Sequence, residues 1–172
     1  MKNVIVLLFF ISINMHAQFG SENIVSDEES GPISVVLVDL NNDSFLDILI
    51  SARFGNMVVW YANLDGQGSY SEAKIIDSSL PDPEDTISFD VDGDGDEDGI
   101  SLSGSNDWIV WYENLDGEGT FSNRMTISNT AQQPFSLGSA DLDLDGDIDL
   151  VAGYIGNDSV VWFENLNGLG SF

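Results

Sequence analysis

Short apolar runs separated by polar turns recur along the chain at a spacing of 51 residues. After a shared proline, each unit opens with an extended stretch, which reads ISVVLV from Ile33, DTISFD from Asp85 and FSLGSA from Phe135. A second apolar run follows an acidic loop and begins at Ile48, Ile100 or Leu150. This alternation of short runs and turns predicts two antiparallel strands joined by a hairpin loop.

The next apolar run is the strongest strand signal of each unit. It reads MVVWY, WIVWY or SVVWF and ends at Tyr61, Tyr112 or Phe163. These β-branched and aromatic runs do not alternate with polar residues, so we expect a strand covered on both faces. A glycine-containing turn such as NLDGQG follows, and a fourth strand is expected from Tyr70 or Phe121. Four antiparallel strands per unit make the blade of a β-propeller, so the sequence predicts an all-β fold.

The 51-residue register extends well beyond the strands. We place the repeats at residues 27–77, 78–128 and 129–172, preceded by a strand of the fourth type at residues 19–25. A propeller closes with about 4 to 8 blades, so these blades are expected to form an incomplete propeller. Either further blades follow in a longer protein or copies of the chain associate. Ten positions are identical in all three units, which in the first unit are Pro32, Asp39, Asp43, Asp47, Val59, Trp60, Asn63, Leu64, Gly66 and Gly68.

The N-terminus has the layout of a secretory signal peptide. One lysine precedes an apolar run from Val4 to Ile13, and small Ala17 follows; the run is too short for a membrane span. We expect residues 1–17 to be removed and residues 18–172 to form a secreted or cell-surface protein. A buried strand or a retained anchor is the alternative interpretation of this segment.

Charge and composition narrow the possible partners and metals. All 30 acidic residues and three of the four basic ones lie after Ala17, so the mature charge is 3 minus 30, or −27. Such a chain is poorly suited to nucleic acid or to anionic membrane surfaces. There is no cysteine, and the one histidine, His16, lies in the predicted signal peptide, which excludes zinc and copper sites of the usual kind.

The acidic loop has the same nine-residue frame in each unit: DLNNDSFLD from Asp39, DVDGDGDED from Asp90 and DLDLDGDID from Asp141. Oxygen-bearing side chains stand at positions one, three, five and nine, and position seven can offer its backbone carbonyl, as calcium ligation in a tight loop requires. A lone acidic run is equally well read as a solvated surface loop, but three copies in register favour ligation. The predicted ligands are Asp39, Asn41, Asp43, Phe45 and Asp47; Asp90, Asp92, Asp94, Asp96 and Asp98; and Asp141, Asp143, Asp145, Asp147 and Asp149.

The three predicted sites differ in strength, and they are not EF-hands. Glycine at position six permits a sharp turn in the second and third loops, whereas the first loop has Ser44 there and neutral Asn41 at position three. We therefore expect up to three bound calcium ions, with the first site the weakest. An EF-hand needs glutamate at position twelve and flanking helices; position twelve here is Ile50, Ser101 or Ala152. Magnesium fits less well because it demands stricter octahedral geometry.

These loops and the flanking WYENLDGEGTF pattern resemble FG-GAP and VCBS-type repeats, the calcium-binding blades of integrin α-subunit propellers and of many secreted bacterial proteins. The resemblance covers residues 19–172. It implies that the acidic loop joins the first two strands of a blade, that its side chains at positions one, three, five and nine hold the ion, and that the calcium is mainly structural. The FG-GAP dipeptides are poorly kept, which favours the VCBS-like bacterial branch.

The remaining aromatic and acidic residues favour a scaffold over an enzyme. Trp60, Trp111 and Trp162 could stack on sugars, but their place in doubly apolar strands favours packing between blades. Trp108 occurs in one unit only and is a candidate ligand contact. Glu113 and Glu164 could form a glycosidase pair, yet their repeated position favours a structural role. We predict a non-enzymatic adhesion scaffold for glycans or proteins; the alternative is a propeller portion of a secreted polysaccharide-acting enzyme.

Overall fold

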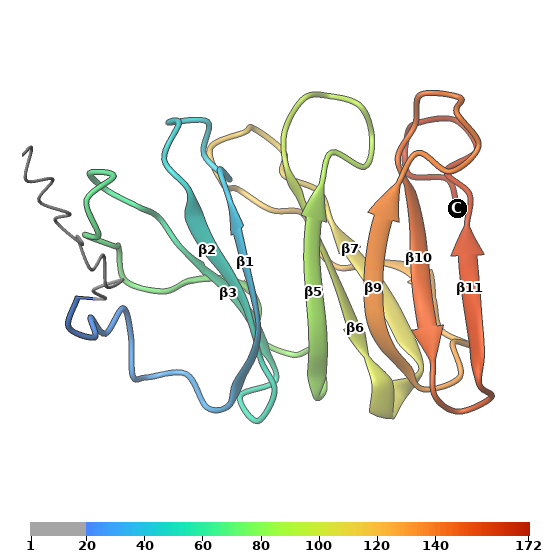
Figure 1. Cartoon of the computed structure of the whole chain (residues 1–172), viewed down its shortest axis with the longest axis horizontal. Coiled ribbons are helices and arrows are strands. Elements are labelled where there is room, and N and C mark those ends of the chain that lie inside the picture. The colour runs from blue at the N-terminus through green and yellow to red at the C-terminus, as the bar shows by residue number, and fades with distance from the viewer. Residues whose placement is uncertain (1–19) are drawn as a thin grey trace, which may run out of the picture.

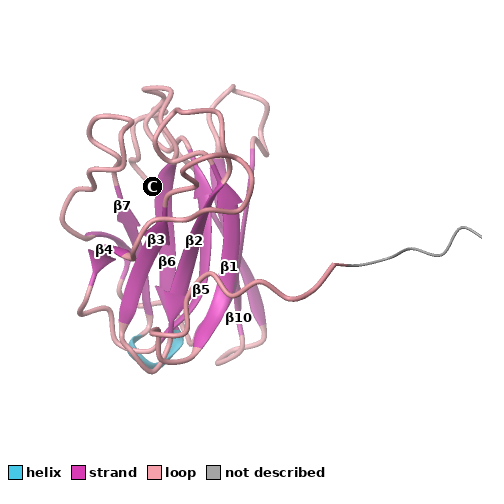
Figure 2. Ribbon diagram, turned by 90° about the vertical axis from the view of Figure 1, so that its left-hand side faces the viewer, coloured by secondary structure: helices cyan, strands magenta, loops and turns pink. Residues whose placement is uncertain are grey.

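The computed structural model describes residues 20–172, which form three antiparallel sheets standing side by side (Figure 1). Within each sheet the strands pair in sequence order, so each sheet has the meander of a propeller blade. A short 3-10 helix, η1 (Gly104–Asn106), cyan in Figure 2, lies in the turn between β6 (Asp98–Ser103) and β7 (Trp108–Tyr112). Blade 1 contains β1 (Pro32–Val38), β2 (Asp47–Ala52), β3 (Met57–Tyr61) and β4 (Lys74–Asp77); blade 2 contains β5 (Pro83–Phe89), β6 (Asp98–Ser103), β7 (Trp108–Tyr112) and β8 (Met125–Ser128); blade 3 contains β9 (Pro134–Ala140), β10 (Asp149–Tyr154) and β11 (Ser159–Phe163).

The predicted all-β fold of blade-like units is confirmed. The first strands β1, β5 and β9 lie next to one another, so the blades are arranged side by side, as in an incomplete propeller. The polar turns after β2, β6 and β10 each hold a residue with positive φ at the same register position, namely Asn56, Asp107 and Asp158. Asparagine and aspartate tolerate this conformation better than other non-glycine residues.

Each blade has two apolar faces. We call the face that carries Val59, Val110 or Val161 the leading face, and the face that carries the repeated tryptophan the trailing face. Val110 and Tyr112 of blade 2 pack into one cluster with Leu49 and Trp60 of blade 1. The leading face of blade 2 therefore covers the trailing face of blade 1.

The contact between blades 2 and 3 repeats this arrangement. Leu150 and Ala152 of the leading face of blade 3 pack with Ile100 and Trp111 of the trailing face of blade 2. The expectation that the third strand is covered on both sides is thus confirmed for β3 and β7, whose last four residues are buried. It is wrong for β11, where burial alternates, because no described sheet covers its trailing face.

The predicted start of the fourth strand is wrong by four residues. Tyr70 and Phe121 form only isolated bridges, with Asn63 and Asn114, and the strands begin at Lys74 and Met125. The hydroxyl of the intervening serine causes this break in the ladder. In blade 1, for example, the Ser71 Oγ accepts a hydrogen bond from the Ala62 backbone N–H at 3.0 Å, in place of a ladder carbonyl.

The N-terminal predictions have two different outcomes. The signal peptide at residues 1–17 lies outside the described residues. The strand expected at residues 19–25 is not seen in the described part of that segment, since residues 20–25 contain no strand. β4 and β8 pair with the third strand of their own blade. Within residues 20–172, no helix is long and apolar enough to span a membrane.

Candidate metal-binding loops

The three acidic loops connect β1 to β2, β5 to β6 and β9 to β10, and they project from the same end of the three blades (Figure 1). Position six has positive φ in all three loops, including Ser44 at 71°, as the glycines of the other two copies predict. Position four also has positive φ, which the sequence did not reveal because Leu144 there is a bulky residue. Two left-handed residues per loop turn the backbone N–H groups inward.

Position one organises the loop from within. The Asp90 Oδ1 accepts a hydrogen bond from the Gly93 N–H at 2.7 Å, and its Oδ2 accepts one from the Gly95 N–H at 3.0 Å. Asp141 makes the same pair of contacts in the third loop. Aspartate at position one therefore stabilises the turn even before any ion is considered.

Position nine holds the loop against the turn that follows the third strand of its blade. The buried carboxylate of Asp98 accepts one hydrogen bond from the Asn114 N–H at 2.7 Å and another from the Val91 N–H at 3.1 Å. Burial raises the pKa of Asp98 to about 7, although these two hydrogen bonds lower it, and nearby Asp92 raises it further. Asp47 and Asp149 accept hydrogen bonds from the corresponding two N–H groups.

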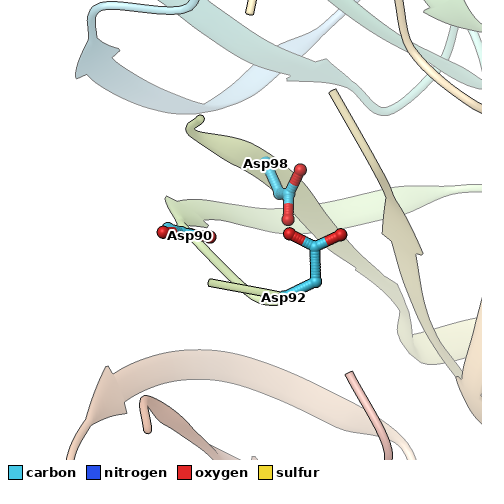
Figure 3. A group of neighbouring side chains, drawn as sticks. All are labelled: Asp90, Asp92 and Asp98. Atoms are coloured by element: carbon cyan, nitrogen blue, oxygen red, sulfur yellow. The ribbon is translucent and has the colours of Figure 1, made fainter. Parts of the chain in front are cut away.

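Two loops bring three carboxylates together. Asp90, Asp92 and Asp98 each offer an oxygen, and these oxygens lie within 4.8 Å of one another; Figure 3 shows the carboxylates of Asp92 and Asp98 turned toward each other. Asp141, Asp143 and Asp145 form the equivalent group in the third loop. Burial, followed by repulsion from Asp94, raises the pKa of Asp92. Clustered carboxylates with raised pKa values are groups that a bound cation would stabilise.

The loops differ in which predicted positions meet. The second loop assembles positions one, three and nine, whereas the third assembles positions one, three and five. Among the described residues, the first loop forms no such group of three carboxylates. Its position three is Asn41, whose amide donates a hydrogen bond to Asp43 at 2.9 Å. The four side-chain positions named from the sequence thus all contribute in one loop or another, although not together in one loop.

At position seven, the contact that the structure shows is made by the side chain, whereas the predicted ligand is the backbone carbonyl. The Asp96 Oδ1 accepts a hydrogen bond from the Asn42 amide of the neighbouring loop at 2.8 Å, so this carboxylate links two loops. The backbone carbonyls of Phe45, Asp96 and Asp147 as ion ligands remain a prediction.

One repeated residue was missed as a part of the site. The backbone N–H of Asn114 donates to Asp98, and its side-chain amide donates to the Leu40 carbonyl of the preceding blade at 2.9 Å. Asn165 repeats both contacts with Asp149 and with the Val91 carbonyl. The asparagine therefore ties its own acidic loop to the loop of the previous blade, and its identity in all three repeats was the available signal.

The tryptophans behave as packing residues where two blades meet. Trp60 and Trp111 are buried in the clusters between blades, as expected, whereas Trp162 is 47% exposed. Trp108 packs at the edge of the cluster between blades 1 and 2, and the Arg124 guanidinium lies 5.2 Å from its ring centroid. One face of Trp108 is therefore occupied, and its role as a ligand contact remains a prediction.

The chain is similar to a known repeat family and to a solved structure. A search of curated protein sequences found no match. Among solved structures, the chain is similar to the V. cholerae biofilm matrix protein Bap1, with 25% sequence identity and a TM-score of 0.40, over 79% of this chain and 23% of that one; the chain thus spans less than a quarter of Bap1. The family model of the FG-GAP-like repeat matches residues 90–152, from the start of the second acidic loop to β10. The resemblance inferred from the sequence is confirmed for residues 90–152, which match the FG-GAP-like repeat.

Proposed function

We propose that the chain is a secreted calcium-binding scaffold without enzymatic activity, in which the ions hold the hairpin between the first two strands of each blade. The observation that carries this proposal is the convergence of Asp90, Asp92 and Asp98, with its counterpart in the third loop. The carboxylates at positions one and nine accept hydrogen bonds from backbone N–H groups. These hydrogen bonds fix the carboxylates on the hairpin. Ions placed there stabilise folded blades, and such a role suits an adhesion protein that presents its surface to glycans or proteins outside the cell.

Calcium suits these loops better than other ions. The candidate ligand atoms are all oxygen, and neither cysteine nor a histidine after residue 16 is present. Metals that prefer sulfur or nitrogen ligands therefore have no preferred ligands here. Calcium accepts six to eight oxygens at irregular geometry, which matches loops that assemble different subsets of positions. The net charge of −27 after removal of residues 1–17, obtained as 3 minus 30, is also reduced when cations bind.

Thermal unfolding with and without calcium tests the proposal. Binding to the folded state alone contributes about 2.7 kcal/mol per site at a hundredfold excess over Kd. Two occupied sites should then raise Tm by roughly 10–20 °C for a chain of this size. Magnesium at the same concentration should give a smaller shift, and an unchanged Tm in calcium would contradict the proposal.

A matched pair of variants assigns the effect to the loops. Asp90→Asn removes a charge from position one of the second loop. Asp116→Asn removes the same charge from the neighbouring turn, where Asp116 likewise accepts two backbone N–H groups, from Glu118 and Thr120. The calcium-induced rise in Tm should shrink in Asp90→Asn and persist in Asp116→Asn. Equal loss in both variants would show that calcium acts through general charge screening.

A further inference from the structure

Buried hydrogen bonds join the position-nine carboxylates of the three acidic loops to one another. Each carboxylate accepts two backbone N–H groups, one from position two of its own loop and one from the repeated asparagine of its own blade. In blades 2 and 3, the side-chain amide of that asparagine also donates to the position-two carbonyl of the preceding loop. The residues linked in this way are Asp47, Leu40, Asn114, Asp98, Val91, Asn165 and Asp149.

The first link joins the first loop to the second. The Leu40 N–H donates to Asp47 at 3.0 Å, and the Leu40 carbonyl accepts a hydrogen bond from the Asn114 amide at 2.9 Å. The Asn114 N–H completes the link, because it donates to Asp98 at 2.7 Å. Asp47 and Asp98 are both candidate ion ligands, so a ligand of one site is three hydrogen bonds away from a ligand of the next.

The second link repeats this arrangement between the second and third loops. The Val91 N–H donates to Asp98 at 3.1 Å, and the Val91 carbonyl accepts a hydrogen bond from the Asn165 amide at 2.8 Å. The Asn165 N–H donates to Asp149 at 2.9 Å. Asp98 takes part in both links, with Oδ1 in the first and Oδ2 in the second. The second loop therefore lies in the middle of a chain of hydrogen bonds that connects all three loops.

This chain of hydrogen bonds is shielded from water along its length. A buried polar group that loses its partner costs free energy, and neighbouring hydrogen bonds in such a setting strengthen one another. A change in the position of one member is therefore passed to the next. The seven members are each at most 1% exposed, namely Leu40, Asp47, Val91, Asp98, Asn114, Asp149 and Asn165.

A second contact joins the first two loops at the surface. Asn42, at position four of the first loop, donates its amide to Asp96 at 2.8 Å and to the Gly117 carbonyl at 3.3 Å. Asp96 stands at position seven of the second loop. Asn42 has φ 55°, so the left-handed turn that shapes the first loop also presents this amide to the next blade.

We propose that the candidate calcium sites are positively coupled, so that an ion in the second loop raises the affinity of the first loop for calcium; this inference rests on the proposed calcium-binding function. An ion held by Asp90, Asp92 and Asp98 fixes the carboxylate at position nine and, through Asn114, position two of the first loop. The first loop then loses less conformational entropy when it binds its own ion. Through Asn165, the same ion acts on the third loop.

Electrostatic repulsion acts in the opposite direction. An ion in the second loop makes the local potential less negative, which weakens the attraction of the next ion. Salt weakens this repulsion, because the Debye length falls from about 8 Å at physiological ionic strength to about 3 Å at 1 M. The buried hydrogen bonds are not affected by this screening. The coupling should therefore increase as the salt concentration rises.

The backbone N–H of position six gives a separate probe of each loop. It donates to the position-one carboxylate in all three loops, and it belongs to Ser44, Gly95 or Gly146. Calcium titration of the isotope-labelled chain, followed by NMR, should show a saturable change of all three signals, with that of Ser44 saturating last. The absence of a saturable change in all three signals would refute the proposed calcium binding, and the coupling with it.

Removal of the second site tests the coupling. Asp90→Asn should raise the calcium concentration at the midpoint of the Ser44 signal at least about fivefold, the lower end of typical coupling between sites. Electrostatics alone predicts the opposite sign, because the filled loop gains two positive charges whereas the variant loop loses only one negative charge. A Ser44 midpoint that stays the same or falls, with calcium still bound, would overturn the coupling and leave the proposed function standing.

Asn114→Ala tests whether the buried link carries the effect. This variant loses the amide that reaches Leu40 but keeps the backbone N–H that donates to Asp98. The Ser44 midpoint should already be raised in Asn114→Ala, and adding Asp90→Asn should raise it much less than in the parent chain. An equal rise in both backgrounds would overturn the proposal. If Asn114→Ala fails to fold, the sign of the Asp90→Asn effect and its increase with salt still decide the question.

Asn63→Ala is the matched control. Asn63 and Asn114 each donate an amide to the position-eight carbonyl of their own loop, and each accepts the N–H of a turn glycine. The side chain of Asn63 is not a member of the buried chain of hydrogen bonds. In Asn63→Ala, adding Asp90→Asn should still raise the Ser44 midpoint at least about fivefold. Loss of the effect in Asn63→Ala as complete as in Asn114→Ala would overturn a link between blades.

Discussion

The packing between blades can be tested at one glycine. In each contact between two blades, a turn glycine of one blade lies on the tryptophan of the previous blade. Gly119 has φ +84°, and a Cβ there would overlap the Trp60 ring; Gly68 has φ +103°, and a Cβ there would meet no atom within 4 Å. Alanine at either position carries the backbone strain of a positive φ, about 1–3 kcal/mol. Only Gly119→Ala also overpacks a buried ring, which costs about 1–3 kcal/mol more.

Gly119→Ala should therefore lower the free energy of unfolding by about 1–3 kcal/mol more than Gly68→Ala. Urea unfolding, followed by tryptophan fluorescence, measures the difference from the shift in midpoint at constant m. Gly170→Ala, which would overlap Trp111, should repeat the larger effect. Equal destabilisation by Gly119→Ala and Gly68→Ala would refute the contact between the turn and the tryptophan.

Two further predictions concern buried charges. Folding raises the pKa of Asp98 from 3.8 to about 7, so the folded state binds a proton that the unfolded state has lost. The free energy of unfolding in calcium-free buffer should therefore fall as the pH rises from about 4 to 7. Asp98→Asn should remove this part of the pH dependence of chemical unfolding. Arg124→Met should cost about 2–3 kcal/mol in the same assay, because it strands the Asp77 carboxylate, which is 8% exposed. Asp82→Asn removes only the more exposed partner of Arg53 and leaves Arg53 paired with Glu84 at 2.8 Å, so it should cost less than about 1 kcal/mol. Similar costs for Arg124→Met and Asp82→Asn would contradict this reasoning.

The sequence predicted the units of this fold because each blade is specified by local signals. The strand runs, the turn glycines and the tryptophan repeat within each 51-residue frame, so the strand pattern of each blade follows from a single copy. The fourth strand was placed too early because the Ser71 and Ser122 hydroxyls replace ladder contacts, and side-chain competition for a backbone N–H leaves no mark in apolar periodicity.

Features that depend on contacts between neighbouring blades could not be predicted from the sequence of one repeat. Trp60 and Trp162 have the same local sequence pattern, yet one is buried and the other is half exposed, because burial is decided by the blade that follows. The candidate site shows the same limit. Its ligand positions follow from spacing within a loop, whereas the amide that Asn114 donates to Leu40 crosses between blades.

The structure also gives a reason why the three loops should differ in their affinity for calcium. Aspartate stands at position three of the second and third loops, and both assemble a group of three carboxylates. Asn41 and Ser44 make the first loop less charged and less easily turned. Because affinity for calcium rises with the number of charged ligands, the first loop should bind last.

Direct titration of calcium into the chelator-treated chain is the most direct test of these loops as ion sites. Isothermal titration calorimetry should show saturable binding, with two ions bound more tightly and a third bound more weakly, and Asp90→Asn should remove one of the tighter two. The absence of saturable binding at millimolar calcium, or an unchanged number of tight sites in Asp90→Asn, would contradict the account.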